Sequence, residues 1–81
     1  MARIDLHLFE KQAKWWQELM RNRAKELAKI RQKEKLSDKD LALIQDTFRR
    51  LNHMHIIEFD GTEKESDVSD TFWKFMNYLA G

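Results

Sequence analysis

The first sixty residues of the chain contain neither proline nor glycine, the two residues that most often end a helix. Apolar residues recur in the first half of this stretch at seven-residue intervals, a spacing typical of a helix that packs against another helix. Two interleaved series carry the pattern: Leu6, Ala13, Met20 and Leu27, and Phe9, Trp16 and Ile30, with Arg23 interrupting the second. We therefore expect one helix over residues 4–35, about 45 Å long.

Two interruptions divide the remainder of the chain. Ser37 is a favourable N-cap residue, and the acidic residues that follow it place negative charge at the positive end of a new helix. Gly61 can adopt a positive φ angle within the polar stretch "FDGTEKESDVSD", which indicates a loop. The sequence thus predicts a second helix over residues 38–57 and a short C-terminal helix over 68–80.

Both of these shorter helices have one apolar face. Ser66 or Ser69 is expected to cap the C-terminal one. The two faces comprise Leu41, Ile44, Phe48 and Leu51 in the second helix, and Val68, Phe72, Phe75, Met76 and Leu79 in the third. Laid along the long helix, they predict an all-α, three-helix protein in which residues 1–81 form one domain.

The composition narrows the class of protein further. The 81 residues include no cysteine, so neither a disulfide framework nor a thiolate metal site is available. The N-terminal segment lacks the apolar core of a signal peptide, and no run approaches the ~20 apolar residues of a membrane-spanning helix. We expect a cytoplasmic protein that works away from membranes.

The apolar arc of the predicted long helix is wider than one neighbouring helix can cover. Leu8, Trp15 and Leu19 form a second ridge beside the main series, because residues four and seven apart share a helix face. Adjacent tryptophans lie about 100° apart on a helix, so Trp15 and Trp16 point in different directions. We predict that Leu8, Trp15, Leu19 and Trp73 form a partner interface. The alternative is that the two shorter helices straddle the long one and cover both ridges.

Charge is distributed unevenly around a net charge of +1. The segment "RNRAKELAKIRQKEK", residues 21–35, holds seven cations and two acids, whereas residues 58–70 hold six acids and one lysine. Such a basic helix can follow a phosphate backbone or an acidic protein surface, or can simply be solvated. The residues predicted to contact an anion or nucleic acid are Arg21, Lys25, Lys29, Arg31 and Lys33.

Histidine is the only residue type that invites a catalytic reading, at "RRLNHMHIIEFDG", residues 49–61. On a helix, His53 and His55 would diverge and could not share a metal, and His55 would be a partly buried helix-end residue. On an extended segment they would share one face with Ile57, but no second strand is evident nearby to pair with such a segment. We expect no catalytic residue, metal or cofactor here.

These observations favour a non-enzymatic small helical protein that binds another protein and forms a homodimer. A regulator, an adaptor or a stoichiometric inhibitor of the phage or plasmid type would have this character. The alternative is a small nucleic-acid-binding regulator that uses the basic end of the first helix. A hydrolytic or metal enzyme would require His53 and His55 to converge.

Overall fold

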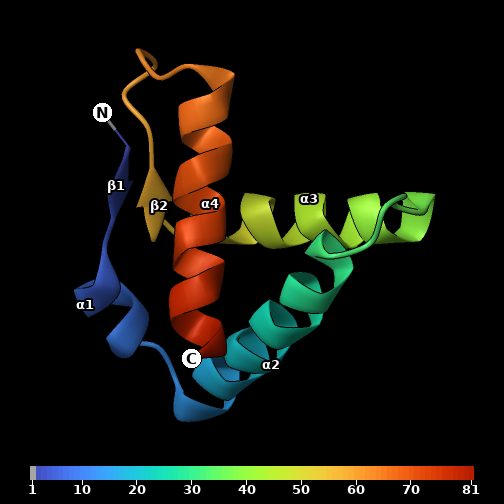
Figure 1. Ribbon diagram of the computed structural model, residues 1–81. Helices are drawn as coiled ribbons and strands as arrows, with labels where there is room; N and C mark the ends of the chain where they lie inside the picture. Colours follow the sequence, from blue (N-terminus) through green and yellow to red (C-terminus); the bar gives the residue numbers. More distant parts are fainter. Residues whose placement is uncertain (1) are drawn as a thin grey trace.

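The computed structural model describes residues 2–81, and these residues are mostly helical (Figure 1). Their elements in chain order are β1 (Arg3–Ile4), α1 (Leu6–Glu10), α2 (Lys14–Arg31), α3 (Asp38–His53), β2 (Ile57–Glu58) and α4 (Glu65–Ala80). The two strands are two residues long each, so the predicted all-α class is confirmed.

The prediction of one unbroken helix over residues 4–35 is wrong. The helical path stops after Glu10 and resumes at Lys14, although the sequence between them contains neither proline nor glycine. The break leaves some backbone carbonyl groups without helical partners, and the side chains of two glutamines donate hydrogen bonds to them. The side-chain amide of Gln12 donates to the Leu8 carbonyl (3.2 Å), and the side-chain amide of Gln17 donates to the carbonyls of Glu10 (3.0 Å) and Gln12 (2.8 Å).

The break folds α1 back against the rest of the molecule and buries Phe9. The Phe9 ring meets the Phe75 ring edge-on, with 5.7 Å between their centroids, and lies 5.8 Å from the ring of Trp16. A continuous rod would carry Phe9 away from α4. The aromatic burial gained at Phe9 therefore helps to offset the helical hydrogen bonds that are lost at the break between α1 and α2.

The N-terminus supplies the strand partner that the sequence did not reveal. β1 pairs with β2 in antiparallel register, with Arg3 opposite Glu58 and Ile4 opposite Ile57. Beyond the ladder, the Asp5 amide donates to the Ile56 carbonyl (2.8 Å). The prediction that a strand after residue 55 would have no partner is wrong, because that partner lies more than fifty residues earlier in the chain.

The start of α3 confirms the predicted cap. The Ser37 hydroxyl accepts a hydrogen bond from the Asp40 amide, and the Asp40 carboxylate accepts one from the Ser37 amide, each at 3.1 Å. This reciprocal pair is a capping box. The helix ends at His53 rather than at 57, because the chain turns through His55 at a φ of 63° and then enters β2.

The C-terminal helix begins earlier than predicted. α4 starts at Glu65, and the carboxylate of Asp67 accepts a hydrogen bond from the backbone of Lys64 (3.4 Å), so neither Ser66 nor Ser69 is its cap. The expected core face is present apart from Val68, which is only half-buried. Its buried members are Phe72, Phe75, Met76 and Leu79.

The helices enclose the core without forming a parallel bundle. α2 packs against α4, starting beside its C-terminal end and diverging from it, and the β1–β2 ribbon lies beside α4 (Figure 1). α3 runs across α4 and projects past it on the side away from the strands (Figure 1). The molecule is consequently flat, with extents of 34 × 33 × 19 Å.

Arg23, which interrupts the apolar series of the first helix, joins α2 to α3. Its guanidinium donates to the hydroxyl of Thr47 (3.3 Å) and lies 3.6 Å from the carboxylate of Asp46. Thr47 is buried, and its own hydroxyl donates to the Leu43 carbonyl (2.8 Å). The polar residue in the stripe therefore makes a polar contact between α2 and α3 that an apolar side chain could not make.

Candidate interaction surfaces

The tryptophan doublet is divided between the interior and the surface. Trp16 is half-buried against the core, whereas Trp15 is 70% exposed. One turn further along α2, Leu19 is 48% exposed. These two residues lie at positions i and i+4 on one helix, so their side chains form one convex apolar ridge, here called the α2 ridge.

The other two predicted interface residues lie elsewhere. Leu8 is half-buried and packs against the core through the fold-back of α1. Trp73 is also half-buried, and the guanidinium carbon of Arg31 lies 4.8 Å from the centre of its ring, within cation–π range. The structure thus assigns Trp15 and Leu19 to one surface, and places Leu8 and Trp73 apart from it.

Of the five cations predicted to contact an anion, three already interact with other side chains of the chain. Arg21 lies over the ring of Phe9 at 5.7 Å, and Arg31 lies over Trp73. Lys33 forms an ion pair with Asp40 at 3.1 Å. Lys25 and Lys29 are exposed. Three of the five cations are therefore used to hold the fold together.

Asp40 is the one residue of this region whose ionisation the fold clearly alters. It is buried at the first turn of α3. The hydrogen bond from the Ser37 backbone, followed by the one from Lys33, holds the pKa of the Asp40 carboxyl below its ordinary value of 3.8. The group is a charged cap at neutral pH, and its role is structural.

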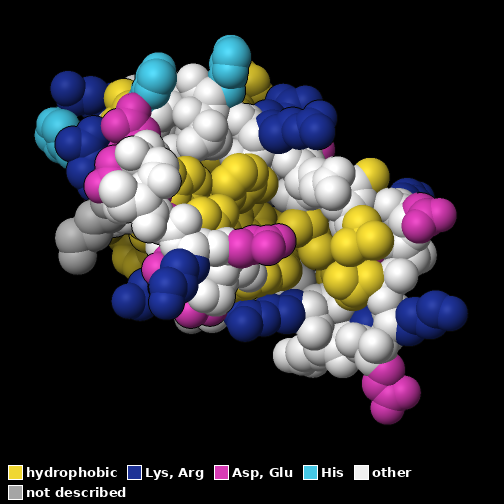
Figure 2. All heavy atoms as spheres, turned by 90° about the horizontal axis from the view of Figure 1, so that it is seen from above, with side chains coloured by type: hydrophobic (Ala, Val, Ile, Leu, Met, Phe, Trp, Pro, Cys, Tyr) yellow, Lys and Arg dark blue, Asp and Glu magenta, His cyan; other side chains and the backbone are white. Residues whose placement is uncertain are grey.

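A second apolar surface lies where α3 passes α4. A groove of about 470 Å³ separates the two helices, and its apolar lining consists of Ile44, Phe48, Val68, Phe72 and Trp73. Leu41 continues the α3 side of this lining and is 43% exposed. We call this surface, including Leu41, the α3–α4 groove. Seen from above, hydrophobic side chains gather in a band across this face, with charged groups around it (Figure 2).

The groove was not predicted from the sequence. Leu41, Ile44, Phe48 and Leu51 recur at intervals of three and four residues, which predicts one buried face. The predicted face is buried only in part, because α4 crosses α3 near one end instead of running along it (Figure 1). A helix crossed near one end cannot be covered at its other end by the same neighbour.

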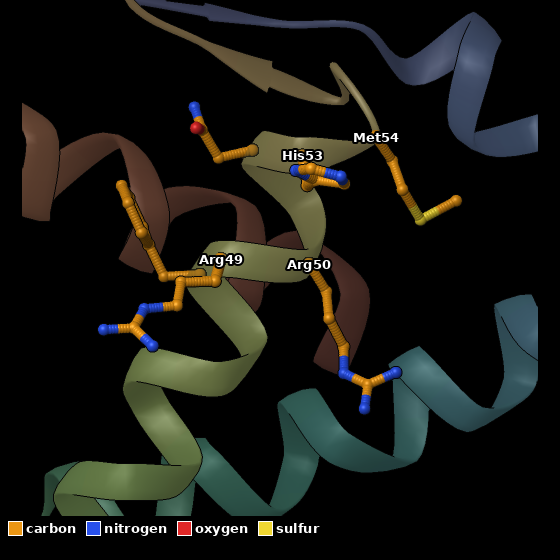
Figure 3. Close-up of a pocket in the computed structure, with 6 residues that line it drawn as sticks. Arg49, Arg50, His53 and Met54 are labelled. Carbon is orange, nitrogen blue, oxygen red and sulfur yellow. The ribbon is translucent and has the colours of Figure 1, made fainter.

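A further open cavity of about 540 Å³ lies at the C-terminal end of α3, lined in part by Arg49, Arg50, His53 and Met54 (Figure 3). The two arginines leave the helix in different directions (Figure 3), and the guanidinium of Arg50 is held by the carboxylate of Asp46 at 3.0 Å. Because the cations diverge, this cavity does not present several donors to one anion.

The histidines do not converge on a ligand. His53 is exposed in the last turn of α3. His55 is also exposed, rather than the partly buried helix-end residue predicted, and its Nδ1 lies 2.6 Å from a carboxylate oxygen of Glu58. Glu58 also pairs with Arg3 at 3.1 Å. Among residues 2–81, no group of three or more His, Asp or Glu side chains is arranged to hold a metal ion.

In the acidic loop, carboxylate side chains accept hydrogen bonds from backbone amides of the same loop. The Glu63 carboxylate accepts hydrogen bonds from the amides of Asp60 (3.0 Å) and Gly61 (3.1 Å), and the Asp60 carboxylate accepts one from the amide of Thr62 (2.9 Å). Gly61 has a φ of 89°, as its predicted role in a loop requires. These acids close a turn between β2 and α4.

Comparison with protein-family models, curated proteins and solved structures found no significant match to this chain. In the part of the chain that the structure describes, none of the helices has the length and apolar character needed to cross a membrane.

Proposed function

We propose that this chain is a non-enzymatic cytoplasmic interaction protein, a regulator, adaptor or stoichiometric inhibitor that works by binding another protein as a homodimer. The observation that carries the proposal is the exposure of Trp15, together with Leu19, on the convex face of α2. Burying a tryptophan of this exposure removes a large rigid apolar surface from water. Tryptophan is enriched among the few residues that dominate binding energy at interfaces.

The surroundings of the α2 ridge support its role as an anchor. Lys14 and Glu18 flank it and are exposed, which gives an apolar centre with a charged rim. Tyr78, another exposed aromatic residue, lies near the end of α4, and α4 ends beside the first turns of α2 (Figure 1). A partner that accepts the indole of Trp15 in a pocket would therefore meet further apolar surface at the same end of the molecule.

The alternative, a nucleic-acid-binding regulator, has less support. Its five cations include three that are engaged with Phe9, Trp73 and Asp40. Phosphate-driven binding gains affinity with each cation that is free to replace a counterion. Lys25 and Lys29 remain exposed for such a role, and two cations supply a correspondingly small share of affinity.

Affinity capture from cells of the source organism tests the protein-binding proposal. The wild-type chain is compared with Trp15→Ala and with two matched controls, Lys14→Ala and Glu18→Ala, which alter exposed neighbours on the same helix. We expect one specific protein to be recovered with the wild type and with both controls. Its affinity for the purified Trp15→Ala variant should fall by at least about 30-fold, since hot-spot truncations cost about 2 kcal/mol or more.

The variant must remain folded for this comparison to be valid, and circular dichroism and thermal melting establish that. Because Trp15 contributes little to the core, its melting temperature should stay close to that of the wild type. Recovery of the same proteins, at the same affinity, by wild type and Trp15→Ala would rule out the α2 ridge as the binding surface.

A further inference from the structure

Burial declines steadily along the apolar stripe of α3. Leu51, near the C-terminal end, is fully buried; Phe48 and Ile44 are half-buried; and Leu41, near the N-terminal end, is 43% exposed. The decline follows the projection of α3 beyond α4 (Figure 1). The stripe forms one continuous apolar face on α3, and residues 2–81 cover its outer half only in part, at Ile44, and leave Leu41 exposed.

The α3–α4 groove has a well-packed floor. The ring of Phe48 stacks on that of Phe59 at 5.7 Å with an interplanar angle of 18°, and meets that of Phe72 at 5.8 Å and 60°. Trp73 lies edge-on to Phe72 at 5.2 Å. Aromatic packing of this kind holds the walls in place, so the groove exists before any partner arrives.

The chain exposes more surface than its mass requires. Its accessible surface is 6000 Å², whereas a monomeric protein of 9.9 kDa typically exposes about 5200 Å². The excess of about 800 Å² is comparable to what each partner buries in a protein interface of standard size. A flat molecule of this kind reaches the usual ratio of surface to mass when one of its faces is covered by a second copy.

The two walls of the groove carry opposite charges that are not used within the chain. Arg49 lines the α3 wall and Glu65 lines the α4 wall. Both are exposed, and among residues 2–81 neither forms an ion pair or hydrogen bond. If two grooves face each other across a two-fold axis that runs along the groove, each basic wall meets the acidic wall of the other copy.

We infer that the α3–α4 groove is the homodimer interface, in which each copy covers the exposed Leu41–Ile44 end of the other copy's α3. The inference rests on the proposed function and adds to it that dimerisation and partner binding use two different surfaces. The concave, self-complementary groove joins two copies, and the convex α2 ridge stays free for a different protein. The α2 ridge of one copy entering the groove of the next would instead make a heterologous contact, which extends into open chains.

Sedimentation of the purified full-length chain tests the inference. We expect a closed dimer whose mass does not increase further with protein concentration. Leu41→Lys adds a charge at the apolar end of α3 that the other copy would cover, and the dimer dissociation constant should rise by at least about 30-fold. Ala42→Lys adds the same charge at the next residue of α3, an exposed position outside the groove lining, and should leave the dimer intact.

A charge exchange gives a second test that does not depend on the core. Arg49→Glu and Glu65→Arg each place like charges across the two-fold axis, and each should weaken the dimer by about tenfold. The double variant restores opposite charges and should recover most of the wild-type affinity. Such recovery distinguishes a contact between copies from a general loss of stability, which the double variant would not reverse.

Three results would overturn the inference. They are a wild-type chain that stays monomeric at high micromolar concentration, a dimer that survives Leu41→Lys but is lost in Trp15→Ala, and assemblies that grow beyond two copies. The first result would also remove the homodimer from the proposed function. None of the three decides whether the chain binds another protein, because capture of a partner through Trp15 is measured separately. Conversely, a dimer that is lost in Leu41→Lys stands even if no partner depends on Trp15.

Discussion

α3 and α4 have the same length, 16 residues each, yet they are buried to very different degrees. α4 buries four large apolar side chains, whereas Leu51 is the one fully buried large apolar residue that α3 contributes among the described residues. The difference lies in their neighbours. α4 packs against α2 and has the β1–β2 ribbon beside it, while α3 is crossed near one end (Figure 1). An amphipathic pattern marks a face that needs cover, and the arrangement of the other elements decides how much of it receives cover.

The largest expected effect comes from breaking the covered helix. Phe75→Ala removes a ring that is 1% exposed and that contacts Phe9 across the fold-back of α1. The free energy of unfolding should fall by about 3–5 kcal/mol, as for other buried phenylalanines. Because a small domain has only about 5–15 kcal/mol in total, this loss is a large fraction of the stability, and unfolding should require much less denaturant than in the wild type.

Urea denaturation followed by circular dichroism measures this loss. Tyr78→Ala is the matched control, since it truncates an exposed aromatic side chain of the same helix. The control should cost about 1 kcal/mol or less. Equal losses for Phe75→Ala and Tyr78→Ala would mean that α1 and α4 do not pack as described.

Two leucines on α3 sharpen the comparison within a single helix. Leu51→Ala creates a cavity in the core and should cost about 2–5 kcal/mol. Leu41→Ala, ten residues earlier on the same stripe, should change the stability of the isolated chain by about 0.5 kcal/mol or less. Denaturation at a protein concentration at which sedimentation shows a monomer measures both.

The proposed dimer makes a further distinction between these two variants. Raising the protein concentration should increase the apparent stability of the wild type more than that of Leu41→Ala, because association stabilises the folded state by mass action. Similar costs for Leu51→Ala and Leu41→Ala in dilute solution would contradict the decline of burial along α3.

The smallest effect concerns the capping box that starts α3. Ser37→Ala removes the hydroxyl that accepts from the Asp40 amide and should cost about 1 kcal/mol. The pKa of the Asp40 carboxyl is lower in the folded chain than its ordinary value of 3.8. Its contribution to stability is therefore complete at neutral pH and is lost as the pH falls below about 4 and through the folded-state pKa.

Stability measured between pH 7 and pH 2.5 checks this sign. The wild type should lose more stability on acidification than Asp40→Asn, which has no carboxyl to protonate. Lys39→Gln, an exposed neighbour in the same turn, is the control and should follow the wild-type pH profile. A pH profile of Asp40→Asn that coincides with that of the wild type would show that the charged cap does not contribute.

Several features could be predicted because they depend on residues close together in the sequence. Ser37 was predicted to cap the second helix, and the structure confirms this cap and adds the reciprocal bond from Asp40, three residues later. Three of the four buried positions of α2, Met20, Leu27 and Ile30, belong to the predicted apolar series, and the fourth, Ala24, does not. Local spacing and cap chemistry suffice for such features, because both partners lie within one helical turn or on one helical face.

The predicted partner interface remains a prediction, and the structure shows how exposed each of its residues is. Trp15 and Leu19 were selected, with Leu8, because they form a second ridge, and the structure leaves Trp15 and Leu19 exposed. Leu8 is half-buried by the fold-back of α1, and Trp73, a residue of another helix, is half-buried beneath Arg31. Which apolar residues remain exposed depends on the placement of segments that are distant in sequence, and no local pattern carries that information.

By itself, the sequence determined the helical class and the positions of two helix starts to within a few residues. The tertiary structure alone decided that residues 11–13 break the first helix and that Ile4 pairs with Ile57. The physical reason is that both events exchange local helical hydrogen bonds for contacts between segments far apart in the chain. Those contacts acquire their free energy when the whole molecule has assembled.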